Sequence, residues 1–334
     1  MKRLYISALL LIFSFTSCLL AQWKPDVLGE GFEQLIIEMP DDYEGKVNCA
    51  LVRSLSEQPT TKAVLYIHGF NDYFFQAEQA QEYNNHGYDF FAVDLRKYGR
   101  AYLPHQKRGN IRSLDEYYAD IDTCLSIIKK DYPEIILAAH STGGLIASVY
   151  AQDHRQNLPV KGIVLNSPFL DMNFSGFKEA IGVPIVSALG GIMPNVEISS
   201  GEDDFYAQSI HQDYNGEWDY NLEWKPAVSI PVSFGWTRAI HKGHKKVQKG
   251  MDIPCPILVL HSDKSVYGDN FSEDFMKGDA VLDVADIHEY GLMLGEQVTI
   301  ATIEDGVHDL VLSSPEVRET VYMIIFSWLQ EKGL

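Results

Sequence analysis

Short apolar runs rich in β-branched residues alternate with longer segments of helical periodicity from about residue 60 onward. Strands buried on both faces form continuous apolar runs of this length, and helices connect neighbouring parallel strands. The alternation therefore predicts an α/β fold, with a mostly parallel, twisted sheet and helices on both faces. The predicted strands are Ala63 to Ile67, Phe90 to Asp94, Ile135 to Ala139, Ile163 to Asn166, Ile257 to Leu260 and Val298 to Ile303.

Both ends of this region extend the pattern. Residues 32–38 and 47–55 are apolar and flank the turn-rich sequence 40–42, which predicts an antiparallel start to the sheet. Near the carboxyl end, Ser314 is a candidate N-cap and Pro315 suits a first helical turn. The apolar residues that follow at helical spacing predict a helix that closes the sheet: Val317, Val321, Ile324, Ile325, Trp328 and Leu329.

The alternation stops between Pro168 and about Asp252, a segment rich in glycine, proline, aromatic and acidic residues. Such a long interruption is uncommon in a compact domain unless it has its own structure or covers a site. We therefore expect residues 168–252 to form a cap over the carboxyl edge of the sheet. Residues 22–167 and 253–334 would form the two parts of the core.

The amino terminus has the organisation of a signal peptide. Lys2 and Arg3 precede an apolar run over residues 4–15 and a short polar stretch that ends at Ala21. This run is shorter than the roughly 20 residues of a spanning helix, so a retained membrane anchor is the weaker alternative. We expect residues 1–21 to be removed and the protein to be exported, to the periplasm or the medium. Another alternative is a lipoprotein cleaved before Cys18, although residues 15–17 match a lipobox poorly.

Charge and cysteine content narrow the possible partners. The chain has 334 residues, 46% of them apolar, and a net charge of −19. This acidity disfavours binding to nucleic acid or to an anionic membrane. Three cysteines would remain after cleavage, enough for at most one disulfide and without the paired spacing of a zinc site. We expect no metal and no organic cofactor, and the sequence leaves the oligomeric state open.

The strongest local motif surrounds Ser141. A predicted strand leads into Ala139-His-Ser-Thr-Gly-Gly144, and an apolar helical run follows. This order matches the G-x-S-x-G nucleophile elbow, in which small residues flank a serine on a sharp turn. Ala139 replaces the first glycine of that motif. A helix cap is the alternative role for a serine at this position.

A serine hydroxyl needs an imidazole to accept its proton, and a carboxylate to orient that imidazole. His308 follows the last predicted strand through a short loop and meets the first requirement. Four carboxylates are candidates for the second, namely Asp171, Asp263, Asp279 and Asp283. Asp263 directly follows its strand and is the first choice by position alone.

Together these motifs resemble the α/β-hydrolase superfamily. The resemblance depends on residues 139–144, on His68-Gly-Phe70 after an early strand, on residues 94–100 after the next strand, and on the His308 loop. It covers about residues 60 to 331. Within the superfamily, the lysophospholipase, monoacylglycerol lipase and serine aminopeptidase-like group is the most similar.

The resemblance implies particular roles. In this group the acid usually lies in a stretch similar to residues 279–284, and Asp279 precedes His308 by 29 residues. The resemblance therefore favours Asp279 as the acid, with Asp263 second and Asp283 third, and it requires an insertion over about residues 262–278. It also implies that the backbone N–H groups of Phe70 and Thr142 form an oxyanion hole.

Other residues near these motifs have structural roles as their simplest interpretation. We expect His68 to brace its loop, and Asp94 and Arg96 to form an ion pair under the elbow. Asp283 could cap the following helix and Asp263 could order the insertion. His241 and His244 lack a third ligand, so a solvated basic patch is the favoured interpretation there.

The predicted function is that of an exported serine hydrolase acting on a monoacyl lipid or a small carboxylic ester through an acyl-enzyme intermediate. Apolar cap residues could line an acyl pocket or form the core of the cap; they are Phe169, Phe174, Phe177, Ile181, Ile185, Leu189, Met193 and Trp218. A serine aminopeptidase-like peptidase is one alternative, in which Glu202, Asp203 or Asp204 would hold a substrate ammonium. A non-catalytic binding protein on the same scaffold is the other.

Overall fold

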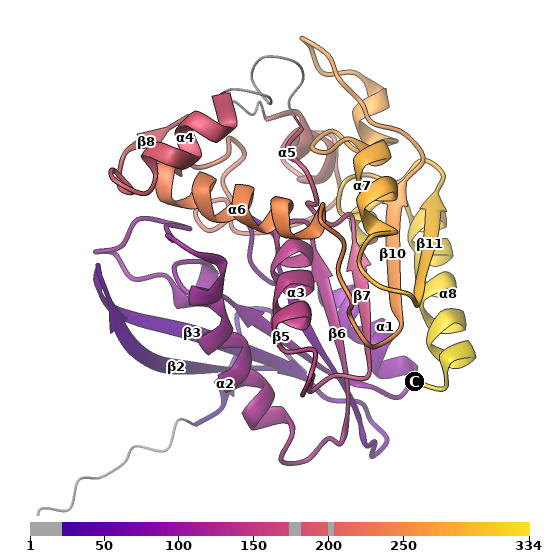
Figure 1. The fold of residues 1–334 in the computed structure, drawn as a ribbon. Helices are drawn as coiled ribbons and strands as arrows, with labels where there is room; N and C mark the ends of the chain where they lie inside the picture. Colours follow the sequence, from indigo (N-terminus) through magenta and orange to yellow (C-terminus); the bar gives the residue numbers. More distant parts are fainter. Residues whose placement is uncertain (1–21, 174–181, 200–203) are drawn as a thin grey trace, which may run out of the picture.

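The computed structural model describes residues 22–173, 182–199 and 204–334. In these residues a sheet of nine strands has the order β1-β2-β3-β5-β4-β6-β7-β10-β11 (Figure 1). Its strands are β1 (Lys24–Pro25), β2 (Phe32–Asp42), β3 (Gly45–Ser54), β4 (Lys62–Ile67), β5 (Asp89–Asp94), β6 (Glu134–His140), β7 (Gly162–Asn166), β10 (Ile257–Ser262) and β11 (Val298–Ile303). The predicted signal peptide lies outside the described residues.

The sheet is parallel from β5 to β11 and antiparallel from β1 to β5. All six strands predicted from the apolar runs are present, and so is the antiparallel start. The prediction of a mostly parallel α/β sheet is confirmed. The turn between β2 and β3 falls at residues 43–44, slightly later than the turn-rich sequence indicated.

Side chains alternate between the two faces of the sheet along each buried strand. Both faces are therefore apolar, and helices cover both of them. On β4, Ala63, Leu65 and Ile67 pack into the core cluster that contains α2 (Tyr118–Ile128) and α3 (Thr142–Asp153). Val64 and Tyr66 point to the other face and pack with α1 (Ala77–Asn85) and α8 (Pro315–Lys332). The remaining core helix, α7 (Val284–Gly291), precedes β11 and joins the first cluster through Ile287.

The carboxyl-terminal helix α8 begins at Pro315, as predicted, and its apolar residues pack on the sheet. Ser314 occupies the N-cap position, but its side chain accepts no backbone hydrogen bond there. The predicted helix is therefore confirmed, whereas the predicted side-chain cap is wrong. Proline at the first position already lacks one of the N–H groups that a cap would satisfy.

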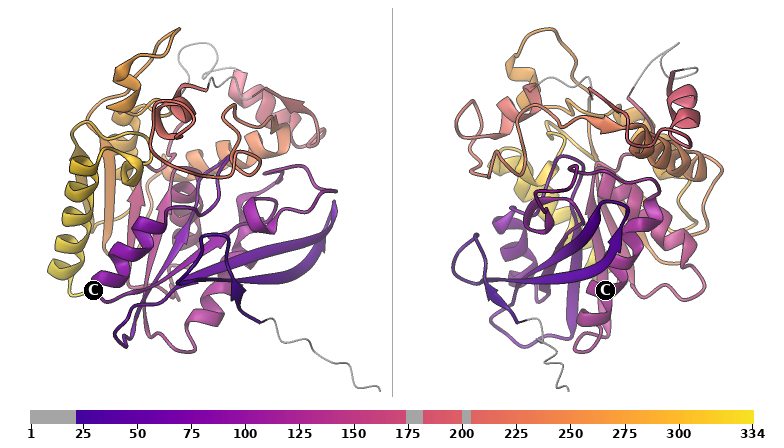
Figure 2. Two further views of the ribbon diagram at one scale, coloured as in Figure 1. Left: turned by 180° about the vertical axis from the view of Figure 1, so that it is seen from behind. Right: turned by 90° about the vertical axis from the view of Figure 1, so that its left-hand side faces the viewer.

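The interruption after β7 contains small elements of its own: α4 (Val183–Leu189), β8 (Glu197–Ile198), α5 (Phe205–Ile210), β9 (Val232–Ser233) and α6 (Phe234–Val247). Strands β8 and β9 pair with each other and not with the main sheet. Figures 1 and 2 show α4, α5 and α6 grouped above the sheet, beyond the amino-terminal end of α3. Side chains of α6, including Trp236 and Ile240, continue the core cluster into this region.

None of the helices formed by the described residues has the length and apolar character that crossing a bilayer requires.

Candidate active site

Ser141 lies on a strained turn between β6 and α3. Its φ of 51° and ψ of −120° are unfavourable for a residue with a side chain, and such strain concentrates at functional sites. The Ser141 N–H donates to the carbonyl of Asn166 at the end of β7, which ties the turn to the neighbouring strand at 3.0 Å. Although Ser141 occupies the N-cap position of α3, its side chain makes no capping hydrogen bond. The helix-cap alternative is therefore wrong.

Two glycines after the serine allow the close approach of neighbouring backbone. A Cβ on Gly143 would lie 2.4 Å from the carbonyl oxygen of His68, and one on Gly144 would lie 2.6 Å from Cβ of Pro168. Both positions therefore exclude any side chain. Ala139, at the first glycine position of the motif, is buried in the core, where its methyl group is accommodated.

The structure brings Ser141, His308 and Asp279 into one hydrogen-bonded chain. Nε2 of His308 lies 3.0 Å from Oγ of Ser141, and Nδ1 lies 2.9 Å from Oδ2 of Asp279. The other carboxylate oxygen of Asp279 accepts the N–H groups of Val281 and Leu282, each at 2.8 Å. Since Asp279 and His308 are buried, the carboxylate and the imidazole are held in one orientation.

The insertion expected before Asp279 does not displace it. The Asp279 N–H donates to the carbonyl of Lys264 at 2.9 Å, and its carbonyl accepts the N–H of Val266 at 2.8 Å. These two hydrogen bonds hold together the two ends of the loop formed by residues 267–278. Asp279 therefore stays beside the end of β10, although it is 16 residues further along the chain than Asp263.

The other candidate carboxylates have separate contacts. Asp263 accepts the N–H of Asp305 at 2.9 Å, so it orders the loop that leads to His308. Asp283 caps α7 by accepting the N–H of Ala285. Asp171 lies 3.9 Å from Nδ1 of His244.

A polar network that the sequence analysis missed supports the His308 loop. Asp309 is buried; its Oδ2 accepts from Nε2 of Gln76 at 2.9 Å, and its Oδ1 accepts from Nδ2 of Asn166 at 2.6 Å. Its N–H donates to the hydroxyl of Tyr206 in α5, whose ring packs edge-on against His308 at 5.5 Å. The one signal available in the sequence was a carboxylate directly after the candidate histidine.

The segment 68–70 passes directly over the serine. A Cβ on Gly69 would lie 3.1 Å from Cβ of Ser141. His68 is buried, and its Nε2 accepts the N–H of Leu95 at 3.1 Å, so it braces this segment as expected. In the described turns and loops, neither Phe70 nor Thr142 donates its N–H to a backbone oxygen.

The predicted ion pair between Asp94 and Arg96 is wrong. Asp94 pairs with Arg100 at 2.9 Å, whereas Arg96 pairs with Asp120 at 2.7 Å. The reason is the tight turn at Gly99, which has a φ of 43° and returns the chain towards Asp94. A Cβ there would lie 2.4 Å from Oδ2 of Asp94, so the short approach depends on glycine.

Two further buried groups near the site have shifted pKa values. Burial alone would raise the pKa of Asp72, but the Lys225 ammonium at 3.0 Å outweighs it and holds that pKa below its ordinary value. Burial lowers the pKa of His140, whose ring lies 4.7 Å from that of His308. The lowered pKa disfavours a positive charge on His140 beside the His308 ring.

The interpretation of residues 241–246 as a solvated basic patch is wrong for His244. Its ring is buried against Phe169 at 4.6 Å, and its Nε2 lies 3.0 Å from the Phe169 carbonyl.

In the described ranges, no three histidine, cysteine or acidic side chains are grouped as metal ligands would be. Glu202 and Asp203, two of the three candidates for holding a substrate ammonium, lie outside those ranges. Four aromatic side chains of the cap pack with Tyr73 and Phe75 of the core, namely Tyr206, Trp218, Tyr220 and Trp224.

The fold and the arrangement at the carboxyl edge of the sheet define an α/β-hydrolase. Comparison with known families narrows this class further. The chain belongs to the family described as serine aminopeptidase, S33, whose model matches residues 58–312.

Individual relatives support this assignment. The chain is 27% identical over 208 residues to a monoacylglycerol lipase of Mycolicibacterium smegmatis. The aligned region covers 60% of this chain and 69% of that protein. It is 29% identical over 139 residues to phospholipase YtpA of Bacillus subtilis. The aligned region covers 41% of this chain and 51% of that protein.

Solved structures share the fold. A soluble variant of monoglyceride lipase from Saccharomyces cerevisiae superposes with a TM-score of 0.64 at 16% identity, over 89% of this chain and 96% of that one. A monoacylglycerol lipase from Paleococcus ferrophilus superposes with a TM-score of 0.63 at 20% identity. The superposition covers 86% of this chain and 99% of that one.

Proposed function

We propose that this protein hydrolyses carboxylic esters through an acyl-enzyme intermediate, with Ser141 as nucleophile. The observation that carries the proposal is the chain of contacts from Ser141 Oγ through His308 to Asp279, at 3.0 and 2.9 Å. These are the distances at which an imidazole can take the hydroxyl proton while a carboxylate holds its tautomer.

The reaction follows from the positions of the three groups. Nε2 of His308 accepts the Ser141 proton as Oγ bonds to the ester carbonyl carbon, and Asp279 stabilises the resulting imidazolium. The N–H groups of Phe70 and Thr142 stabilise the oxyanion. His308 then protonates the departing alcohol, and a water molecule, deprotonated by His308, releases the acid and restores Ser141.

The proposed substrate is a monoacyl lipid or a small ester. Two relatives in the comparison carry names of enzymes that act on acylglycerols or phospholipids, which favours a lipid-derived ester. The cap also exposes large apolar side chains, among them Ile185, Ile192 and Met193. Phe174, Phe177 and Ile181 lie outside the described residues.

A fluorophosphonate probe tests the nucleophile directly. We expect stoichiometric labelling of the wild-type protein and none of Ser141→Ala. Hydrolysis of 1-monoacylglycerols and aryl esters is then compared with that of aminoacyl arylamides. Ester turnover without arylamide turnover supports the proposal, whereas the reverse favours the peptidase. Failure to label would favour a non-catalytic binding protein.

We also propose that the protein is exported after cleavage near Ala21. The arrangement of residues 1–21 carries this proposal. Mass spectrometry of the mature amino terminus distinguishes the outcomes, because cleavage near residue 21 supports a secreted or periplasmic protein. A lipid-modified Cys18 or an intact terminus would contradict it.

A further inference from the structure

Asp309, which directly follows His308, is a buried carboxylate without a cation partner. It is only 1% exposed, and no lysine, arginine or histidine side chain of the described residues forms an ion pair with it. The other buried carboxylates at the site do have such a partner. Asp72 pairs with Lys225 at 3.0 Å, and Asp279 binds the imidazole at 2.9 Å. A carboxylate buried like Asp309 destabilises the fold unless its charge is compensated.

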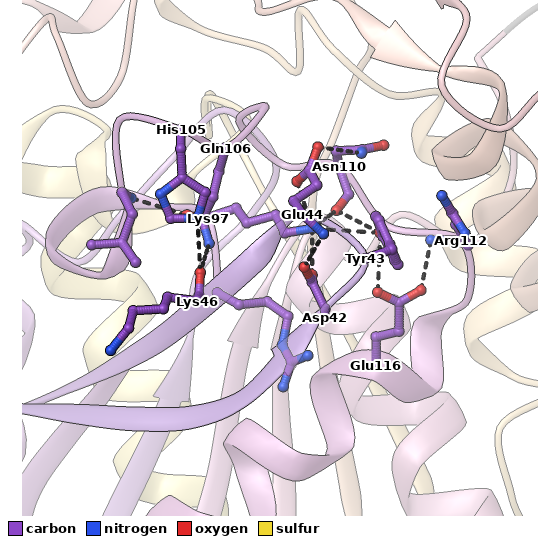
Figure 3. Close-up of polar contacts among 12 residues, drawn as sticks. Asp42, Tyr43, Glu44, Lys46, Lys97, His105, Gln106, Asn110, Arg112 and Glu116 are labelled. Carbon is purple, nitrogen blue, oxygen red and sulfur yellow. Dashed lines mark hydrogen bonds and ion pairs between the residues drawn. The ribbon is translucent and has the colours of Figure 1, made fainter.

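Elsewhere in the fold, buried and nearly buried carboxylates are paired with cations. Lys97 is fully buried and binds Asp42 and Glu44 at 2.7 and 2.8 Å (Figure 3). The remaining pairs of this kind are Arg96 with Asp120 and Arg100 with Asp26 and Asp94. Among the described residues Asp89 also lacks a cation, but it lies at the amino end of β5, at the opposite edge of the sheet from the triad. Asp309 is therefore unusual in lacking a cation beside the candidate active site.

Two side-chain amides hold the Asp309 carboxylate as an acceptor. Nε2 of Gln76 donates to Oδ2 at 2.9 Å, and Nδ2 of Asn166 donates to Oδ1 at 2.6 Å. On its other side, Oε1 of Gln76 accepts the N–H of Phe75 at 3.0 Å. Oδ1 of Asn166 likewise accepts the N–H of Leu310 at 3.2 Å. These backbone donors fix the orientation of both amides, so each directs an N–H group at the carboxylate and favours its ionised form.

The neighbours of Asp309 connect it to the His308 imidazole. The Asp309 N–H donates to the hydroxyl of Tyr206, whose ring packs edge-on against His308 at 5.5 Å. Asn166, which binds the carboxylate, has its carbonyl 3.2 Å from Nδ1 of His140. The His140 ring in turn lies 4.7 Å from that of His308. The carboxylate and the imidazole therefore belong to one buried cluster, where water screens charges little.

The other titratable neighbours do not supply a charge that neutralises Asp309. Burial lowers the pKa of His140, although Asp309 acts in the opposite direction. Burial and the Asp309 charge both raise the pKa of Tyr206. Lys225 is already paired with Asp72. Burial, with a contribution from Asp309, also raises the pKa of two further hydroxyls, those of Tyr66 and Tyr322. The imidazolium formed during the reaction is therefore the cation that this carboxylate meets.

We propose that Asp309 is a positioning residue for His308, whose fixed negative charge stabilises the imidazolium that forms when Nε2 takes the proton of Ser141. The proton leaves Oγ of Ser141 as Oγ bonds to the carbonyl carbon, so a positive charge develops near a carboxylate that is already in place. Such a charge favours the transition state over the resting enzyme, in which the imidazole is neutral. This inference rests on the proposed esterase function and adds a residue to it.

Asp309→Asn in the full chain tests the proposal, because it removes the charge with little change in shape. We expect kcat for aryl ester hydrolysis to fall about tenfold while KM changes by less than about twofold. The acidic limb of the kcat/KM profile should move to lower pH by at least about half a unit, because the imidazolium loses a stabilising anion. A residue that only tethers the His308 loop would change the rate but not the acidic limb. An unmoved limb would therefore overturn the proposal.

Asp89→Asn is the matched control, since it removes the charge of the other buried carboxylate without a cation. It should leave kcat and the acidic limb unchanged, and an equal shift in this variant would overturn the proposal. Asp309→Ser is the second neutral variant, because its hydroxyl can accept from Gln76 or Asn166 without directing an N–H2 group at them. Urea unfolding shows which variants are folded, and Asp309→Ser decides where Asp309→Asn is not.

Failure of the proposed function gives a different result. Ester turnover with an unmoved acidic limb would overturn this inference and leave the esterase function intact. If no ester is hydrolysed and Ser141 is not labelled by a fluorophosphonate, a nuclear magnetic resonance titration of the His308 ring decides. A midpoint at least about half a unit lower in the folded neutral variant than in the wild type supports the role of Asp309. An equal midpoint refutes it.

Discussion

Nζ of Lys225 in the cap lies 3.0 Å from Oδ1 of Asp72 in the core, and both side chains are buried. Asp72 follows the segment that passes over Ser141. The Lys225 ammonium also lies 5.6 Å from the ring of Tyr206, which packs against His308. This ion pair therefore joins the cap to the core beside the candidate active site.

Lys225→Met should lower the free energy of unfolding by about 3 kcal/mol at pH 7, because it leaves a buried carboxylate without its cation. The pKa of Asp72 is lowered in the folded protein. The ion pair therefore stabilises the folded state at every pH above the pKa of the unfolded carboxyl group. This stabilisation is lost as the pH falls through the lower pKa of the folded protein. In Lys225→Met, burial raises that pKa and the carboxyl becomes neutral on mild acidification. Urea unfolding should show the deficit shrinking as the pH falls from 7 to 4.

Lys130→Met removes an exposed lysine and is the control, with an expected change below about 0.5 kcal/mol. The double variant Asp72→Asn/Lys225→Met should recover part of the loss. A deficit of Lys225→Met that stays constant with pH would mean that lost packing, not an unpaired charge, is responsible.

Gly143→Ala should abolish labelling of Ser141 or prevent folding, because the new methyl group would lie 2.4 Å from the His68 carbonyl oxygen. Gly182→Ala is the comparison, since a Cβ there meets nothing within 4 Å and its φ of −62° suits any residue. That variant should keep full activity and gain up to about 1 kcal/mol of stability. Fluorophosphonate labelling and thermal unfolding measure both effects, and wild-type behaviour of Gly143→Ala would contradict the described turn.

The strands, Ser141 and His308 could be predicted because each depends on local signals. Apolar β-branched runs mark buried strands, and the Ser141 turn requires small residues within a few positions of it. Asp279 needed the family resemblance, since position alone favoured Asp263. The two hydrogen bonds that close the excursion before Asp279 have no local signature in the sequence.

The supporting network could not be predicted, because its contacts join distant parts of the chain. Asp309 meets Gln76 across 233 residues, and Lys225 meets Asp72 only once the cap has packed on the core. The wrong pairing of Asp94 with Arg96 has a related cause. Which arginine reaches Asp94 depends on the positive φ of Gly99, a backbone feature that proximity along the chain does not reveal.

Asp279→Asn should reduce kcat by about a hundredfold to ten-thousandfold with little loss of stability. The amide oxygen can still accept from Val281 and Leu282, but the amide nitrogen would face Nδ1 of His308 and favour the wrong tautomer. Asp263→Asn should stay near the wild-type rate, because Asp263 contacts the Asp305 N–H and not the imidazole. Steady-state ester hydrolysis separates the two, and the opposite ranking would contradict the assignment of Asp279.

His244 should make stability depend on pH in the mildly acidic range. Burial lowers its pKa to about 3, and the His241 and Lys245 charges also oppose its protonation, while the Phe169 carbonyl favours it. Asp171, 3.9 Å from Nδ1, is the facing carboxylate. Because the unfolded state takes up the proton near pH 6.5 and the folded state does not, this histidine destabilises the fold as pH falls below that value. The loss amounts to about 2 kcal/mol between pH 7 and pH 5.

In His244→Gln this contribution disappears, so the unfolding free energy of the variant should fall less steeply between pH 7 and pH 5. His105→Gln, at an exposed position, is the control and should keep the wild-type slope. Parallel slopes for wild type and His244→Gln in urea titrations at pH 5, 6 and 7 would show that His244 is protonated in the folded protein.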